Sequence, residues 1–326
     1  MNECPRSLAA AATPSRRNSV TFENLSPLAG YMSRTVLGGS LRNAFSYCVQ
    51  QVRTYDYENY LCLLQLPEKL RTAAFAIRAF NVEIAKVKES AHETNLALMR
   101  LLWWQEAING IYAKSPVGHP VVKALEYITQ EHRLNKHWFS RIIEARIADA
   151  EITTSPVNIA DVEHYAESTA STLLYLTLEA AGIRNTNADH AASHIGKAAG
   201  LALLLRASPF HVGYRRSYIP LELLAKHRFS EEEIYRGKET EALCNAVFEL
   251  ASVANSHLEK ARQLSNAVPP EAFPVLLPAV PAGVLLKSLQ QCGFNIFDQR
   301  LQRGVCGISP LMMQLKIKWQ SLCSTY

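Results

Sequence analysis

The sequence lacks the usual signatures of metal and cofactor chemistry. Its seven cysteines are scattered and include no Cys-x-x-Cys pair, so we expect buried free thiols rather than a zinc site or a disulfide scaffold. No Gly-x-Gly-x-x-Gly or P-loop segment is present, so no nucleotide-binding loop is indicated. His190 and His194 have the spacing of a zinc-ligand pair, but no third ligand accompanies them. The sequence therefore predicts no metal and no cofactor.

Long apolar runs and a strong charge of one sign are also lacking. No stretch reaches the roughly 18–20 uninterrupted apolar residues that a membrane span needs. Residues 272–286 come nearest, but three prolines interrupt them, and we expect buried helix and turn there. Peripheral contact with a membrane remains open. The net charge is only +5, and residues 1–42 contribute much of it, which argues against nucleic acid as a partner.

Residues 1–42 differ in composition from the rest of the chain. They contain five arginines, several serines and no lysine, against only two acidic residues. This composition is typical of a mitochondrial transit peptide, because the matrix-negative potential draws a positive segment inward. An ordinary disordered tail is the alternative. We expect the folded domain to occupy residues 43–326.

From residue 43 onward the pattern of apolar residues is helical almost throughout. The spacings are three and four, no alternating pattern indicates a strand, and the short loops favour one compact domain. Within one predicted helix, Trp103 and Trp104 point about 100° apart, so we expect one in the core and the other at its margin. We also expect Asp189 to cap a helix. We predict an all-α, single-domain helical bundle with helices at residues 70–87, 93–112, 119–131, 135–150, 157–181, 189–205 and 239–265.

Three segments carry a resemblance to a known family. Residues 196–220 have the length and frame of the second aspartate-rich motif of squalene and phytoene synthases. Residues 71–83 are similar to the helix that leads into the family's first aspartate-rich motif, and residues 165–172 to a further family helix that begins with tyrosine. The resemblance extends from about Asn43 to Leu315. It implies the helical fold of isoprenoid (terpenoid) synthases.

In this family the two aspartate-rich motifs bind metal. The enzymes act on prenyl diphosphates, and Mg²⁺ neutralises the leaving group through carboxylates spaced i, i+4 on helices that face the cavity. At the matching positions this chain has Ala85 and Glu89 in the first motif, and Ala207 and His211 in the second. One acid stands where the family has four. The chain is therefore predicted not to be an enzyme.

Several polar residues of the family's site remain in the sequence, as the resemblance implies. Tyr165 matches a tyrosine that acts as acid and base in the head-to-head enzymes, and a core tyrosine with a hydrogen-bonded hydroxyl is the alternative. Lys86 and Lys88 add positive charge beside the first motif. Arg206 and Arg216 match arginines on the diphosphate side, although an ion-pair role is the alternative. These four cations are our candidates for binding an anionic ligand.

A second resemblance is narrower. It joins residues 47–62, 79–83, 102–104 and 119–121 to a mitochondrial subgroup of the family that is needed to build respiratory NADH:ubiquinone oxidoreductase, complex I. This implies the matrix side of the inner membrane as location, peripheral association with that membrane, and complex I subunits or other assembly factors as partners. Our first hypothesis is a non-catalytic assembly factor.

Two alternatives keep a role for the ancestral cavity. One is an enzyme with altered prenyl-diphosphate chemistry, and the other is an isoprenoid or lipid carrier. The enzyme hypothesis predicts an open apolar tunnel that ends at Lys86, Lys88, Glu89 and Arg206.

Overall fold

The computed structural model describes residues 38–326 except 91, 92 and 153, and only the backbone of Glu89 and Ser90. Residues 1–37, most of the predicted transit peptide, lie outside the described residues. The described chain folds into helices, without a strand and with one isolated bridge between Val305 and Ile308. The prediction of an all-α fold is confirmed. Helix α1 begins at Gly39, ahead of residue 43, where the folded domain was expected to start.

The first half of the domain is arranged around α3 (Glu68–Ser90), which contacts α1, α4, α5 and α8. Four alanines on α3, Ala73, Ala74, Ala76 and Ala79, are completely buried, so neighbouring helices approach it closely. Phe80 fills the remaining space and meets Trp104 and Phe139 edge to face. The other helices of this half are α1 (Gly39–Tyr55), α2 (Tyr57–Leu63), α4 (Thr94–Tyr112), α5 (Pro120–His132) and α6 (Lys136–Glu151).

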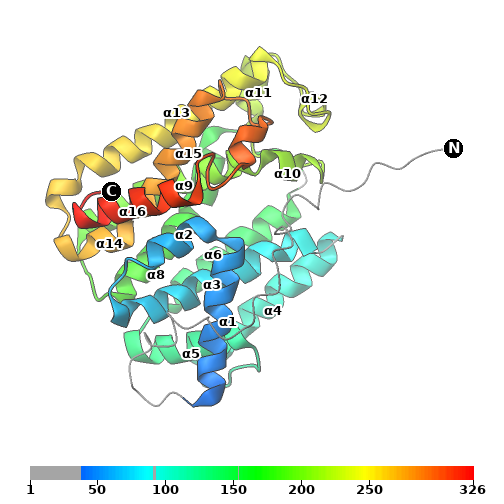
Figure 1. Ribbon diagram of the computed structural model, residues 1–326. Helices are drawn as coiled ribbons and strands as arrows, with labels where there is room; N and C mark the ends of the chain where they lie inside the picture. Colours follow the sequence, from blue (N-terminus) through cyan, green and yellow to red (C-terminus); the bar gives the residue numbers. More distant parts are fainter. Residues whose placement is uncertain (1–37, 91–92, 153) are drawn as a thin grey trace, which may run out of the picture. The chain divides into compact units, whose positions relative to one another are not determined.

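The second half is arranged around α9 (Thr186–Arg206), which packs against α13, α15, α7 and the π-helical turn η3 (Figure 1). Helix α9 contains the first part, residues 196–206, of the segment that resembles the second family motif. The remaining elements are α7 (Ile159–Ala166), η3 (Glu167–Ser171), α8 (Thr172–Ala180), α10 (Ser208–Val212), α11 (Leu221–Lys226), α12 (Glu231–Tyr235), α13 (Glu241–Gln263), α14 (Phe273–Leu276), α15 (Ala279–Gln291) and α16 (Pro310–Leu322).

Two glycines allow α9 to lie directly on α7 and η3. A Cβ atom at Gly196 would be 2.3 Å from the Cα of Ser171, and one at Gly200 would be 2.7 Å from the Cβ of Ala166. Neither distance is possible between packed atoms without backbone movement. The glycines of this segment are therefore required for close helix packing.

Two helix predictions need correction. The helix predicted at 157–181 is divided by η3, where the hydroxyl of Thr172 donates to the carbonyl of Glu167, five residues earlier, and supports the wider turn. The helix predicted from 189 begins at Thr186, and its cap is Asn185, whose side chain accepts from the amide of Ala188 at 3.0 Å. The prediction that Asp189 caps this helix was wrong, because the helix has already begun three residues before Asp189.

The prediction for the adjacent tryptophans is confirmed: Trp104 is 4% exposed in the core, whereas Trp103 is 42% exposed at its margin.

The prediction for residues 272–286 is also confirmed, because they form buried helix and turn across α14 and α15. Among the described helices, none alone has the length and apolar character of a membrane span; Pro270–Leu276 and Ala279–Gln291 meet that test only as a pair bent by 45°.

Candidate functional site

A cavity of about 640 Å³ lies among α3, α6, α8, α9 and α15. Leucines of α8, α9 and α15 give it apolar walls. Its volume shows that the cavity is open rather than filled by side chains. Cations clearly outnumber anions in its lining. The charged lining residues are the acids Asp56, Glu58 and Asp149, and the bases Arg78, Lys86, Lys88, Arg146, Arg206, Arg215 and Arg216.

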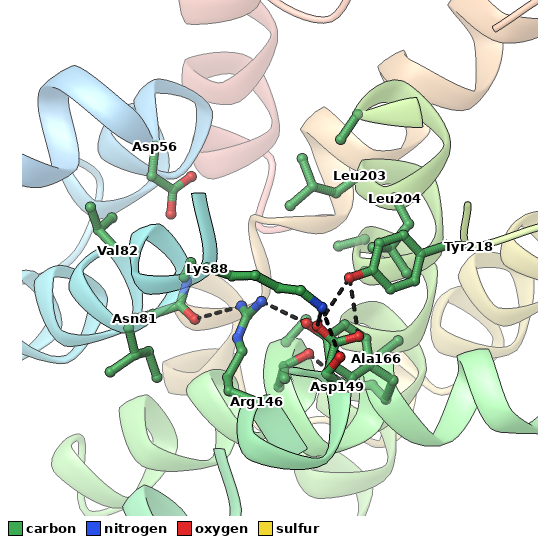
Figure 2. A pocket seen from close by; sticks show the side chains of 18 of the residues that line it. Asp56, Asn81, Val82, Lys88, Arg146, Asp149, Ala166, Leu203, Leu204 and Tyr218 are labelled. Carbon is green, nitrogen blue, oxygen red and sulfur yellow. Dashed lines mark hydrogen bonds and ion pairs between the residues drawn. The ribbon is translucent and has the colours of Figure 1, made fainter. Parts of the chain in front are cut away.

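Asp149, near the end of α6, is surrounded by donors (Figure 2). The hydroxyl of Tyr218 lies 3.1 and 3.0 Å from its two carboxylate oxygens. Arg216 forms an ion pair with the same carboxylate, and Lys88 Nζ lies 3.4 Å from it while donating to the Asp149 carbonyl at 2.7 Å. Burial raises the pKa of Asp149 to about 6, against the opposing influence of Arg146 and Tyr218. One carboxylate thus ties together α3, α6 and the segment after α10.

Arg146, three residues before Asp149 on α6, makes its hydrogen bonds to neutral groups. Its Nη1 donates to the hydroxyl of Tyr165 at 2.6 Å, and its Nη2 donates to Oδ1 of Asn81 at 3.4 Å (Figure 2). Its buried Nε has no hydrogen-bond partner among the described residues. Burial raises the pKa of Tyr165, so the phenol stays protonated at neutral pH. The cavity wall therefore carries a guanidinium with unused donor capacity and no carboxylate hydrogen-bonded to it.

The sequence predicts that His211 stands at the position of a family aspartate. Its ring meets Tyr218 at 4.9 Å between ring centroids, at a steep angle. Burial lowers the pKa of His211 to about 4, and the nearby Arg146 acts in the same direction. At neutral pH this position therefore holds an uncharged ring near the guanidinium of Arg146.

A second polar cluster forms at the α2 side of the cavity. Arg206, at the end of α9, forms an ion pair with Glu58 and donates to Sγ of Cys306 at 3.3 Å. Asp56 lies 3.5 Å from Arg78. Burial alone would raise the pKa of Glu58, but Arg206 outweighs it and holds this pKa below its ordinary value. The geometry gives Arg206 an ion-pair partner inside the protein.

The predicted site residues are brought to one cavity but not to one cluster. Lys88, Tyr165, His211 and Arg216 gather around Asp149 and Arg146, and Arg206 belongs to the second cluster. Lys86 has its own partners, with Nζ 3.8 Å from the centroid of the Tyr55 ring and 3.4 Å from Gln51. Ala85 and Ala207 line the cavity. Glu89 lies in the last turn of α3, and its side chain is outside the described part.

The residues present do not fit the Mg²⁺ ions that family enzymes use. Mg²⁺ needs several carboxylate oxygens that are free to coordinate it. Each described acid of the cavity wall is instead paired with an arginine: Asp56 with Arg78, Glu58 with Arg206, and Asp149 with Arg216. Over the described residues no group of three or more His, Cys, Asp or Glu side chains could hold a metal ion.

Sequence reasoning missed Arg146, Asp149 and Asn81. Arg146 and Asp149 lie in the helix predicted at 135–150, and no role was assigned to them from the sequence. The signal that could have found them is their i, i+3 spacing on the apolar side of that helix, next to the buried Ile142 and Ile143.

Comparison with known proteins agrees with this fold. Residues 52–305 match the squalene/phytoene synthase family. The chain is 41% identical over 273 residues to NADH dehydrogenase (ubiquinone) complex I, assembly factor 6, of Bos taurus, covering 83% of this chain and 82% of that protein. It is 40% identical over 257 residues to the protein of that name from Homo sapiens, covering 79% and 77%.

The solved structures carry the same architecture. Squalene synthase HpnC from Alicyclobacillus acidocaldarius superposes with a TM-score of 0.69 at 20% sequence identity, over 79% of this chain and 97% of that chain. At this identity the likeness shows the fold. The family match covers most of the described domain, and we conclude that this chain belongs to the squalene/phytoene synthase family.

Proposed function

We propose that this chain is a non-catalytic assembly factor for mitochondrial respiratory complex I, acting on the matrix side of the inner membrane. The observation that carries the proposal is its 41% identity, over 83% of the chain, with a Bos taurus protein of that name. In this proposal residues 1–42 are the transit peptide, residues 43–326 form the working domain, and the partners are complex I subunits or other assembly factors.

The cavity supports the non-catalytic part of the proposal. Alanines occupy two of the positions where family enzymes place metal-binding acids, and both alanines line the cavity. Each described acid that lines the cavity forms an ion pair with an arginine. Among the described side chains, the site therefore offers no free carboxylate for metal-assisted departure of diphosphate.

Removing the gene tests the assembly role. We expect the complex I content of mitochondria, measured on native gels, to fall in cells without the gene and to recover when the full chain is returned. A chain without residues 1–42 should not restore it, because import fails. Normal complex I content in the deleted cells contradicts the proposal.

An assay of the purified chain tests the absence of catalysis. Incubation with farnesyl diphosphate and Mg²⁺ should give no turnover above that of buffer. Reproducible turnover that disappears in Tyr165→Phe would overturn the non-catalytic part, because Tyr165 is the hydroxyl that matches the family's acid and base.

A second candidate function is binding of an isoprenoid or lipid, with or without altered chemistry. The observation that favours it is the open cavity of about 640 Å³ with leucine walls and an excess of cations. Three of the four residues at which the enzyme alternative places the end of its tunnel, Lys86, Lys88 and Arg206, line this cavity, whereas the side chain of Glu89 is outside the described part. Native mass spectrometry of the purified chain should then show a bound amphiphile, and its consistent absence argues for the assembly role alone.

A further inference from the structure

The outward face of α16, the C-terminal helix, is apolar. Four of its large apolar side chains are each more than half exposed, and they recur at i, i+4, i+8 and i+11, which places them on one face. We call this set the α16 face: Leu311, Leu315, Trp319 and Leu322. A contiguous apolar face of this kind is unusual on a protein that meets only water.

The α16 face is held in position by the opposite side of the helix. Met313 and Ile317 are completely buried, and α16 packs against α2 and α15 (Figure 1). Gln314 donates to the hydroxyl of Tyr57 at 3.2 Å. Beyond the helix, the hydroxyl of Tyr326 donates to the carbonyl of Ala261 at 3.1 Å, and its ring packs against Phe273. The apolar exposure therefore belongs to a docked helix that is anchored beyond its end.

The charged residues of α16, and those that line the groove beside it, are all basic. Helix α16 contains Lys316 and Lys318 and no acidic residue. Both lysines are exposed, and their positions on the helical wheel place one at each edge of the α16 face. A groove of about 480 Å³ between α16 and α2 continues the face, and its charged lining residues are Arg53 and Lys318.

This combination fits an anionic lipid surface better than it fits a protein. Protein interfaces are depleted in lysine, whereas helices that lie in the membrane interface carry lysines beside an apolar face that includes tryptophan. The aliphatic stems of Lys316 and Lys318 can lie along the apolar face while the ammonium groups reach phosphates. Trp319 has the apolar body and polar N–H that suit the head-group region.

We propose that the α16 face docks on the surface of a bilayer that contains anionic phospholipid. The helix lies parallel to the bilayer plane, with Leu311, Leu315, Trp319 and Leu322 inserted to a depth of roughly 5–10 Å and the lysines on head-group phosphates. The domain is thereby held with one fixed side toward the membrane. This inference is independent of the assembly role, since it requires only the purified chain and lipid.

Vesicle binding tests the proposal. The full chain is floated with vesicles of phosphatidylcholine and phosphatidylglycerol in a two to one ratio. The pair Leu315→Gln and Trp319→Gln should lower the partition coefficient at least about tenfold. Lys316→Gln with Lys318→Gln should lower it roughly tenfold and weaken its dependence on salt. Met99→Gln with Leu102→Gln removes two exposed apolar residues of α4 and serves as the matched control, with little change expected.

Tryptophan fluorescence distinguishes lipid binding by the α16 face from lipid binding by the arginine-rich segment 1–42, because that segment contains no tryptophan. Lipids brominated on their acyl chains should quench part of the fluorescence, and Trp319→Phe should abolish the quenching while Trp103→Phe retains it. Unchanged flotation of the α16 variants, quenching that persists in Trp319→Phe, or equal binding to pure phosphatidylcholine would each overturn the proposal. So would α16 variants that bind vesicles normally but lose complex I subunits on co-purification, because the face would then serve a protein.

Discussion

Among single residues, Arg206 shows how a position that matches a ligand-binding arginine can carry a structural role. Its guanidinium pairs with Glu58, and both side chains are mostly buried. Replacing Arg206 by Met leaves the Glu58 carboxylate in a desolvated place without its counter-charge. We expect the free energy of unfolding to fall by about 3 kcal/mol at pH 7, measured by urea denaturation. A loss within about 0.5 kcal/mol, as for an exposed pair, would show that Arg206 is not a structural partner.

The double variant Arg206→Met with Glu58→Gln is the control. Removing both charges leaves no stranded carboxylate, so the loss should be smaller than that of Arg206→Met alone. The exposed ion pair of Glu259 and Arg262 is the comparison at the surface. There, Glu259→Gln should lower the free energy of unfolding by less than about 1 kcal/mol.

His211 makes stability depend on pH. Burial lowers the pKa of His211 from 6.5 to about 4, so the unfolded chain takes up a proton at a higher pH than the folded chain does. The contribution of this residue is fully present above pH 6.5 and is lost as the pH falls toward 4, with an upper limit of about 3 kcal/mol. The Gln variant of His211 should show a shallower fall over this range in thermal melts.

The control for His211 is His190, an exposed histidine on α9. His190→Gln should leave the acid-side slope of stability as it is in the wild type. Equal slopes for the wild type and His211→Gln would mean that the imidazole of His211 is not desolvated in the folded chain.

At the scale of elements, the contact of α9 with η3 depends on the missing side chain of Gly196. Alanine favours a helix by about 1 kcal/mol over glycine, but here its Cβ would meet the backbone of Ser171 at 2.3 Å. We expect Gly196→Ala to lower the free energy of unfolding by roughly 2 kcal/mol, because the two helices must separate. Gly283 of α15 is the matched control, since its Cβ would first meet the flexible end of Arg262 at 3.4 Å. Gly283→Ala should leave stability unchanged or raise it, and an equal loss in both variants would contradict the packing argument.

Periodicity could predict the long helices, because they bury apolar residues at helical spacing. It could not predict η3, since the wider turn arises from the hydroxyl of Thr172 and from contact with α9, which is distant in sequence. The cavity was predictable in position from the motif segments. The pairing of Arg216 with Asp149 was not, because Arg216 comes from the segment after α10 and Asp149 from α6, and nothing in the sequence marks Asp149 as its partner.

For the whole molecule, the structure separates two surfaces that can serve different purposes. Inside, the domain holds a cavity with cationic walls. Outside, α16 presents an apolar face with lysines at its edges. An assembly factor needs outer surfaces and a stable body, whereas a carrier or enzyme needs the cavity to stay open. The two candidate functions therefore differ in whether they require the cavity to stay open.

A substitution that fills the cavity tests which of the two functions applies. Ala199 of α9 lines the cavity, and Ala199→Phe places a ring in the open space, while Ala199→Ser is the conservative control. In cells without the endogenous gene, both variants should restore complex I to the wild-type level on native gels, because the proposed role does not use the cavity. Thermal unfolding of the purified chains shows whether Ala199→Phe folds. If the folded Ala199→Phe chain fails to restore complex I while Ala199→Ser succeeds, occupancy of the cavity is part of the function, and ligand binding replaces the purely structural role.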